Sequence, residues 1–227
     1  MSDKPVRAVL WDFGGVISSS PFDAFSRFER ERGLPTDFIR KINSVNPHTN
    51  AWALLERNDI DAETFSKKFE EESDAHGFAI PGREILALLD GELRPQMVEA
   101  LKYLSTRYRT ACLTNNVRRG HGPGMSRSPE KAKQVAAVME HFEIIVESSK
   151  VGVRKPEPKF YQMACEMLGV SPDESVYLDD LGINLKPALA MGMRTIKVVD
   201  PDTALAQLAS ILGHGLRDEQ SRQSTQT

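Results

Sequence analysis

Short apolar runs alternate with amphipathic segments along most of the chain. Five runs are four to six residues long, a length typical of strands buried on both faces of a sheet. They cover residues 6–11, 109–113, 143–147, 175–178 and 194–199. Helical periodicity occupies residues 97–104, 158–168, 184–190 and 203–212. This alternation predicts a parallel sheet, so we expect an α/β fold with a Rossmann-like core.

The stretch between the first two runs has a different pattern. Residues 18–91 are helical throughout, with Phe22, Phe25 and Phe28 at a spacing of three and a stop signal at Gly33. The pattern predicts a bundle of four or five short helices. Because this bundle interrupts the alternation, we interpret it as a helical cap inserted into the core.

Domain boundaries follow from the two patterns. The core is expected to comprise residues 1–17 and 92–213, with the cap at residues 18–91. Residues 214–227 are rich in Gln, Ser, Arg and Thr, and so polar a segment buries too little surface to become ordered. We therefore predict a disordered tail after Gly213.

The composition excludes several classes of function. Hydrophobic residues make up 40% and charged residues 27% of the chain, which excludes disorder as the dominant state. A net charge of −3 supplies no positive field for a phosphate backbone, so nucleic-acid binding is not expected. No apolar run approaches the roughly 18 residues of a membrane span, and the first residues lack an apolar signal segment. We expect a cytoplasmic protein with no membrane association, in which Cys112 and Cys165 are buried and reduced.

Polar residues capable of chemistry stand where the predicted strands end. Asp12 follows the first run. Thr114 and Asn115 follow the second, and Asp179 and Asp180 follow the fourth. The carboxyl ends of parallel strands meet at one edge of the sheet, where ligands of such folds bind. We therefore expect these side chains to share one site.

The chemistry of this set points to phosphoryl transfer. Carboxylates from two strands repel each other at a shared edge, and a divalent cation with oxygen ligands, above all Mg²⁺, is the usual compensation. Lys155 and the hydroxyl of Thr114 would suit a phosphate. Alone, Asp12 or Asp180 could equally be a turn or cap residue. Together and in this order, the residues favour a site where positioning and charge neutralisation drive catalysis.

The order of these residues resembles the four motifs of the haloacid dehalogenase superfamily. These motifs are a strand followed by Asp, a strand followed by Thr or Ser, a Lys, and an acidic pair after a further strand. Residues 149–158 and 177–188 resemble the phosphatase-like N-terminal domain of soluble epoxide hydrolases and the related domain of some acyl-CoA dehydrogenase family proteins. The resemblance spans nearly the whole chain and implies a Rossmann-like core with a helical cap.

The resemblance also implies a role for each residue. Asp12 would be the nucleophile that takes the phosphoryl group, and Lys155 would balance the charge beside it. Thr114 and Asn115 would bind the phosphoryl group. The Mg²⁺ ligands would be Asp12, the backbone carbonyl of Gly14, and Asp180 with Asp179 in support.

Gly14 departs from the pattern of most phosphatases in the superfamily. They carry a second Asp there, which protonates the leaving group and later activates water. Such help is typically worth about 10²- to 10⁴-fold in rate. Its absence predicts slow turnover, a good leaving group or a substitute acid. Together with Gly15, Gly14 is also expected to form a turn that needs positive φ.

Three functions remain open. The leading one is a Mg²⁺-dependent phosphatase that hydrolyses a small phosphorylated metabolite through an aspartyl-phosphate on Asp12. The second is a metal-independent haloacid dehalogenase, although those enzymes usually carry an aromatic residue where Gly14 stands. The third is a non-catalytic or weakly active binding domain that kept the fold. Assembly into a homodimer is likewise open.

A glycine-rich segment, Gly120–Gly124, lacks the Gly-Lys-Ser/Thr of a phosphate-binding loop, so we expect a flexible surface loop there. Ser128, followed by Pro129, is predicted to cap the next helix.

Overall fold

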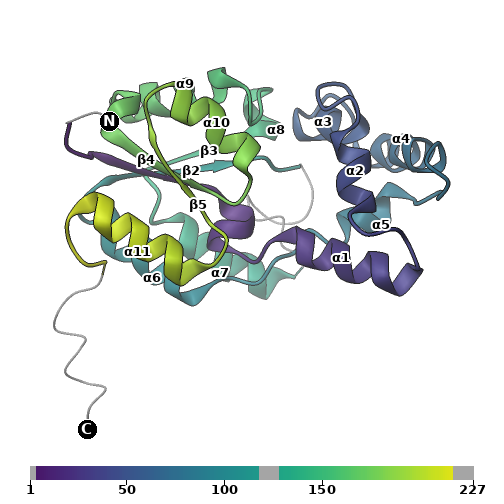
Figure 1. Cartoon of the computed structure of the whole chain (residues 1–227), viewed down its shortest axis with the longest axis horizontal. Coiled ribbons are helices and arrows are strands. Elements are labelled where there is room, and N and C mark those ends of the chain that lie inside the picture. Colours follow the sequence, from purple (N-terminus) through teal and green to yellow (C-terminus); the bar gives the residue numbers. More distant parts are fainter. Residues whose placement is uncertain (1–3, 118–127, 217–227) are drawn as a thin grey trace, which may run out of the picture.

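The computed structural model describes residues 4–117 and 128–216, so the segment Gly120–Gly124 lies outside the described residues. A five-stranded sheet forms its centre, with the order β3-β2-β1-β4-β5 and parallel pairing throughout (Figure 1). The strands are β1 (Ala8–Trp11), β2 (Arg109–Thr114), β3 (Ile144–Glu147), β4 (Ser175–Asp179) and β5 (Arg194–Lys197). The predicted α/β class is confirmed.

Alternate residues of the strands face two layers of helices. Val9 and Trp11 of β1 belong to a cluster on one face of the sheet, and Ala8 and Leu10 belong to a cluster on the other. The helices of the first face are α6 (Pro95–Ser105), α7 (Pro129–Met139) and α11 (Pro201–Leu212), and those of the second are α9 (Pro158–Leu168) and α10 (Gly182–Ala190). Burial on both faces explains the unbroken apolar runs.

Two expectations about the helices can be checked directly. The side chain of Ser128 accepts a hydrogen bond from the amide of Lys131, so the predicted N-cap of α7 is confirmed. In the described part of the chain, no helix is long and apolar enough to cross a membrane.

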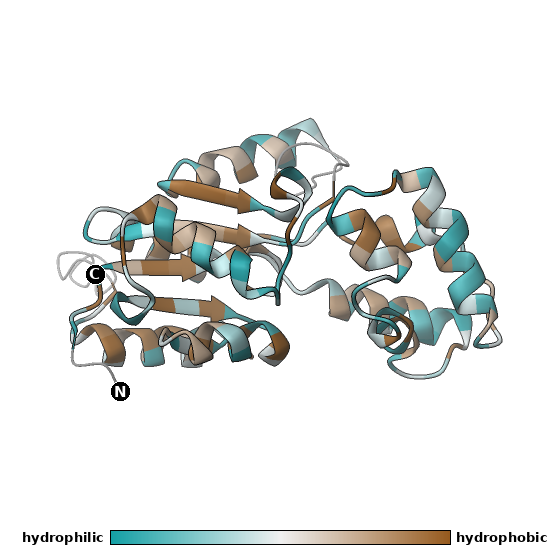
Figure 2. Ribbon diagram, turned by 90° about the horizontal axis from the view of Figure 1, so that it is seen from above, coloured by the Kyte–Doolittle hydropathy of each residue, from teal (hydrophilic) through white to brown (hydrophobic). Residues whose placement is uncertain are grey.

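The helices between η1 and α6 form a separate layer beside the carboxyl ends of the strands. They are α1 (Pro21–Arg32), α2 (Phe38–Ser44), α3 (Ala51–Glu56), α4 (Ala62–Asp74) and α5 (Gly82–Leu86). Their apolar side chains form a cluster of their own, which includes the fully buried Phe65 and Phe69. Figure 2 shows the strand arrows pointing toward this cap.

Two adjacent segments connect the cap to the core. Ser18 and Leu93 form an antiparallel bridge, and the amide of Ser19 donates to the carbonyl of Glu92 at 2.7 Å. The cap is therefore carried on a pair of hydrogen-bonded segments beside the turn that follows β1.

The structure corrects the predicted start of the tail. His214 Nε2 lies 2.7 Å from Tyr108 Oη, and the two rings stack. Leu216 is 9% exposed and belongs to the cluster that contains Trp11. Residues 214–216 therefore pack on the core. Composition missed this because a single apolar residue beyond Gly213 is enough to extend the packing.

Candidate active site

Asp12 lies at the carboxyl end of β1 and is 7% exposed. Its Oδ1 accepts a hydrogen bond from the amide of Phe13 at 2.6 Å, and its Oδ2 lies 2.7 Å from Lys155 Nζ. β1 and β4 are neighbours in the sheet although most of the chain separates them, so Asp12 sits at the point where the strand order reverses. Burial raises the pKa of the Asp12 carboxyl well above its ordinary value, because Lys155 offsets the loss of water only in part.

A tight turn, η1 (Phe13–Ile17), follows Asp12 and contains two glycines with non-helical backbone angles. Gly15 has a φ of +79°, whereas Gly14 has a φ of −69° and a ψ of 129° that any residue adopts. A Cβ on Gly15 would lie 2.1 Å from Asp180 Oδ2, but a Cβ on Gly14 would have no neighbour within 4 Å. The expected positive φ is therefore confined to Gly15. Its missing side chain also allows Asp180 to approach the turn.

Lys155 precedes α9 and is 1% exposed. Its ammonium group lies 2.7 Å from Asp12 Oδ2 and 2.8 Å from Asp179 Oδ2. Burial disfavours the charged form, but the two carboxylates outweigh that effect, and the pKa of Lys155 lies above its ordinary value. The lysine therefore joins the acids of β1 and β4 as a fixed positive charge.

The two acids at the end of β4 differ in their surroundings. Asp179 is fully buried, and its oxygens accept hydrogen bonds from Lys155, the Tyr177 hydroxyl, the Leu181 amide and Asn184. Asp180 has one side-chain partner among the described residues, the hydroxyl of Ser20 at 3.0 Å. Asp179 is thus saturated by donors. Asp180 is the acid with oxygen atoms left for a ligand.

The carboxylates fit a divalent cation. One oxygen from each of Asp12, Asp179 and Asp180 lies within 4.8 Å of the others. Three acids face one lysine, so a positive charge of two would balance the group. Burial, and after it repulsion from Asp179, raise the pKa of Asp180 to about 6.

The two predicted phosphoryl-binding residues lie in different settings. Thr114 ends β2 and is 3% exposed, and its hydroxyl has no hydrogen-bond partner among the described residues. The side chain of Asn115 is engaged: its Oδ1 accepts the Lys155 amide at 2.9 Å, and its Nδ2 donates to the Lys155 carbonyl at 3.0 Å. Thr114 therefore keeps a free donor for a ligand, and Asn115 holds the loop that carries Lys155.

Sequence reasoning missed three residues next to the site. Asn116 is 3% exposed and donates to Glu147 Oε1 at 2.7 Å, which ties the end of β2 to β3. Glu56, at the end of α3 in the cap, is 6% exposed and pairs with Arg154 at 2.6 Å. The one available signal was the position of Asn116 and Arg154 directly beside residues already singled out.

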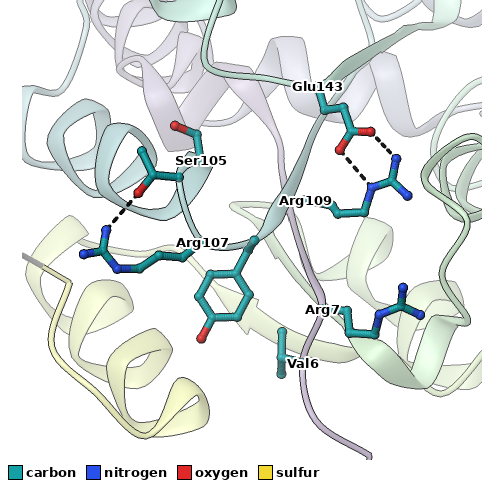
Figure 3. A pocket seen from close by; sticks show the side chains of 8 residues that line it. Val6, Arg7, Ser105, Arg107, Arg109 and Glu143 are labelled. Carbon is teal, nitrogen blue, oxygen red and sulfur yellow. Dashed lines mark hydrogen bonds and ion pairs between the residues drawn. The ribbon is translucent and has the colours of Figure 1, made fainter.

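A depression of about 370 Å³ lies at the opposite, amino-terminal end of the strands (Figure 3). Arg7 and Arg109 line it, and each has a carboxylate partner, Glu174 for Arg7 and Glu143 for Arg109. Both of these ion pairs are partly exposed to water, unlike the buried Asp12, Lys155 and Asp179. The candidate active site is therefore the carboxyl edge, beneath the cap.

Comparison with known families agrees with this geometry. The family model for haloacid dehalogenase-like hydrolases matches residues 6–192, a range that contains β1 to β4 and the cap. The chain belongs to the haloacid dehalogenase-like hydrolase family, and the predicted family resemblance is confirmed.

Two relatives are about a third identical to this chain over the aligned residues. It is 32% identical to acyl-CoA dehydrogenase family member 10 of Mus musculus, over 94% of this chain and 20% of the relative. It is 36% identical to bifunctional epoxide hydrolase 2 of Rattus norvegicus, over 92% of this chain and 39% of the relative. The chain thus spans between a fifth and two fifths of the length of these relatives.

More distant relatives have names of two kinds. A phosphorylated carbohydrates phosphatase of Thermotoga maritima is 25% identical over 84% of both chains. An (S)-2-haloacid dehalogenase of Burkholderia cepacia is 25% identical over 78% of this chain and 70% of the relative. A crystal structure of a HAD family enzyme of Bacteroides thetaiotaomicron, in complex with magnesium and inorganic phosphate, has a TM-score of 0.56 at 20% identity, over 85% of this chain and 93% of that chain. That structural likeness shows the fold alone.

Proposed function

We propose that the chain is a Mg²⁺-dependent phosphatase that hydrolyses a small phosphorylated metabolite through an aspartyl-phosphate on Asp12. One observation carries the proposal: the Asp12 carboxylate lies 2.7 Å from Lys155 in a buried group whose negative charge exceeds its positive charge. A divalent cation and a phosphoryl group bring the charges that such an arrangement lacks. The relative named as a phosphatase adds support.

Different groups of this site would hold the cation and the phosphoryl group. The carboxylates of Asp12 and Asp180 and the carbonyl of Gly14 would bind Mg²⁺, with Asp179 positioning Lys155. When bound, Mg²⁺ would neutralise charge on the carboxylates and on the phosphoryl oxygens. The Thr114 hydroxyl would donate to a phosphoryl oxygen, and Lys155 would compensate the charge that moves from Asp12 to the leaving group.

The reaction would proceed in two displacements at phosphorus. A carboxylate oxygen of Asp12 attacks the phosphorus, the bond to the ester oxygen breaks, and the leaving group departs with the electron pair and takes a proton from water. Water then attacks the phosphorus of the aspartyl-phosphate, which releases inorganic phosphate and restores the carboxylate. Gly14 supplies no proton for the first step, so esters with acidic leaving groups should react fastest.

A hydrolysis assay tests the proposal. Wild-type protein should release p-nitrophenol from p-nitrophenyl phosphate with Mg²⁺ and not with EDTA. Asp12→Asn, which is nearly isosteric and cannot attack phosphorus, should lose at least about 10³-fold in turnover. Asp23→Asn, an acid on the cap helix α1, is the control and should keep wild-type turnover.

Other outcomes identify the other functions. Release of halide from 2-haloacids without Mg²⁺ would assign the chain to the dehalogenases. Absence of both activities in folded protein would favour a binding domain. Residual activity of Asp12→Asn within tenfold of wild type would remove Asp12 from the role of nucleophile.

A further inference from the structure

The cap places one buried carboxylate against the core. Glu56 ends α3 and is 6% exposed. Its Oε1 accepts a hydrogen bond from Trp52 Nε1 at 2.9 Å, within the cap. Its Oε2 accepts hydrogen bonds from residues of the core. A carboxylate removed from water is costly unless it is paired, so its partners indicate what it does.

Arg154 is the first of these partners and directly precedes Lys155. Its Nε and Nη2 atoms both lie 2.6 Å from Glu56 Oε2, and its Nη1 donates to the carbonyl of Pro47 at 3.0 Å. The side chain of Arg154 is 15% exposed. Arg154 therefore directs its donors at the cap, and the chain beside Lys155 is anchored there.

Asn115 is the second partner. Its Nδ2 lies 3.4 Å from Glu56 Oε2 and donates to the Lys155 carbonyl, while its Oδ1 accepts the Lys155 amide. The carboxylate of Glu56 attracts the NH₂ group of the Asn115 side chain and repels its carbonyl oxygen. It thereby favours the one orientation in which Asn115 can bind both backbone groups of Lys155.

We infer that Glu56 is a positioning residue, which acts through Arg154 and Asn115 to fix the backbone of Lys155 and so hold its ammonium group between Asp12 and Asp179. A residue of the cap thus helps to fix the position of a charged group in the core. The effect on turnover rests on the proposed function, whereas the effect on the Lys155 backbone does not.

Amide exchange and kinetics together test this inference. Glu56→Gln keeps the side-chain size and an acceptor for Trp52 but removes the charge that holds Arg154. The exchange rate of the Lys155 amide, followed by NMR, should rise at least tenfold. With Mg²⁺ and p-nitrophenyl phosphate, kcat should fall about tenfold or more while KM stays within threefold, because Lys155 is displaced and the remaining phosphate contacts are kept.

Two further variants separate positioning from general loosening. Glu84→Gln removes an ion pair with Arg32 that lies inside the cap, and it should leave the Lys155 amide and kcat unchanged. Arg154→Gln should reproduce the effect of Glu56→Gln. The double variant should add little to either single change, because both act through one contact.

Each outcome supports or overturns the inference. Faster exchange at Lys155 in a protein without phosphatase activity would support positioning while the proposed function fails. Unchanged exchange and unchanged kcat in an active enzyme would overturn it. Equally faster exchange throughout the cap, or a rise in KM alone, would also overturn it. If Glu56→Gln does not fold, Arg154→Lys, which keeps the charge but loses the two-atom contact, should show the same faster exchange at Lys155.

Discussion

The two ends of the sheet carry charged residues in opposite arrangements. At the carboxyl end, Lys155 is 1% exposed and faces three carboxylates from β1 and β4. At the amino end, the side chains of Arg109 and Glu143 are 40% and 42% exposed and pair with each other (Figure 3). Arg7 and Glu174 form a second such pair there.

This difference in burial of charge distinguishes the candidate active site from the other end of the sheet. Both ends collect charge because strand termini expose loops, and the amino end also has a depression of about 370 Å³. Only the carboxyl end buries charge that the protein leaves unbalanced. An unbalanced buried group is unfavourable for stability, so its presence at a topological switch point indicates a ligand-binding function.

Replacement of one cation at each end of the sheet should give the largest difference in stability between the two ends. Lys155→Met leaves buried carboxylates without a counter-ion and should lower the free energy of unfolding by about 3 to 5 kcal/mol. Arg109→Met, the matched change at the amino end, should cost far less because its pair is exposed to water. Urea unfolding in EDTA at pH 7 measures both. Equal losses would show that the two ends do not differ in this way.

The dependence of stability on pH should reveal the contribution of Asp180 at the carboxyl end of the sheet. The pKa of Asp180 is about 6 in the folded protein and 3.8 in the reference state, so the folded state binds the proton more tightly. Its stabilising contribution is present below about pH 4 and is lost as pH rises through about 6, by roughly 3 kcal/mol. In EDTA, the Asp180→Asn variant should therefore lose less stability than the wild type between about pH 4 and 6. Added Mg²⁺ should stabilise the wild type above pH 6 and the variant much less, and a variant with the same Mg²⁺ response would exclude Asp180 as a ligand.

The turn after β1 offers a gain-of-function test. The backbone and the open space at Gly14 accept a side chain, so Gly14→Asp should fold normally. An acid there should raise turnover of alkyl phosphates by about 10²-fold and that of p-nitrophenyl phosphate much less, because the latter leaving group scarcely needs a proton. Gly15→Asp is the contrasting variant and should be destabilised by its positive φ and the clash with Asp180. Equal gains on both substrates would show that proton transfer was not the missing function.

The smallest effect on stability is expected at the amino-terminal end of the sheet, where residues 214–216 pack beside Tyr108. A protein ending at Gly213 loses the contact of His214 with Tyr108 and the burial of Leu216. It should be less stable by about 2 kcal/mol than one ending at Leu216. Thermal unfolding of the two truncated proteins checks this difference. Identical melting temperatures would show that residues 214–216 contribute nothing.

Much of the fold and part of the site could be predicted from the sequence. Strands buried on both faces leave apolar runs, and the parallel arrangement brings Asp12, Lys155, Asp179 and Asp180 to one edge. The contacts of the Asn115 side chain with the Lys155 backbone were not predicted, because its position fits a ligand contact as well as a backbone contact, and its phosphoryl-binding role stays a prediction. Glu56 was missed because the packing of the cap on the core is a tertiary contact, and a Glu at the end of a short helix has the pattern of a solvated residue.

Detection of a phosphorylated Asp12 tests the central claim most directly. Wild-type protein is mixed with p-nitrophenyl phosphate and Mg²⁺, quenched in acid within one turnover, digested and analysed by mass spectrometry. A phosphoryl group should appear on the peptide that contains Asp12 and be absent with EDTA and in Asp12→Asn. Mg²⁺-dependent release of p-nitrophenol without any adduct on that peptide, or with an adduct on another residue, would contradict the account.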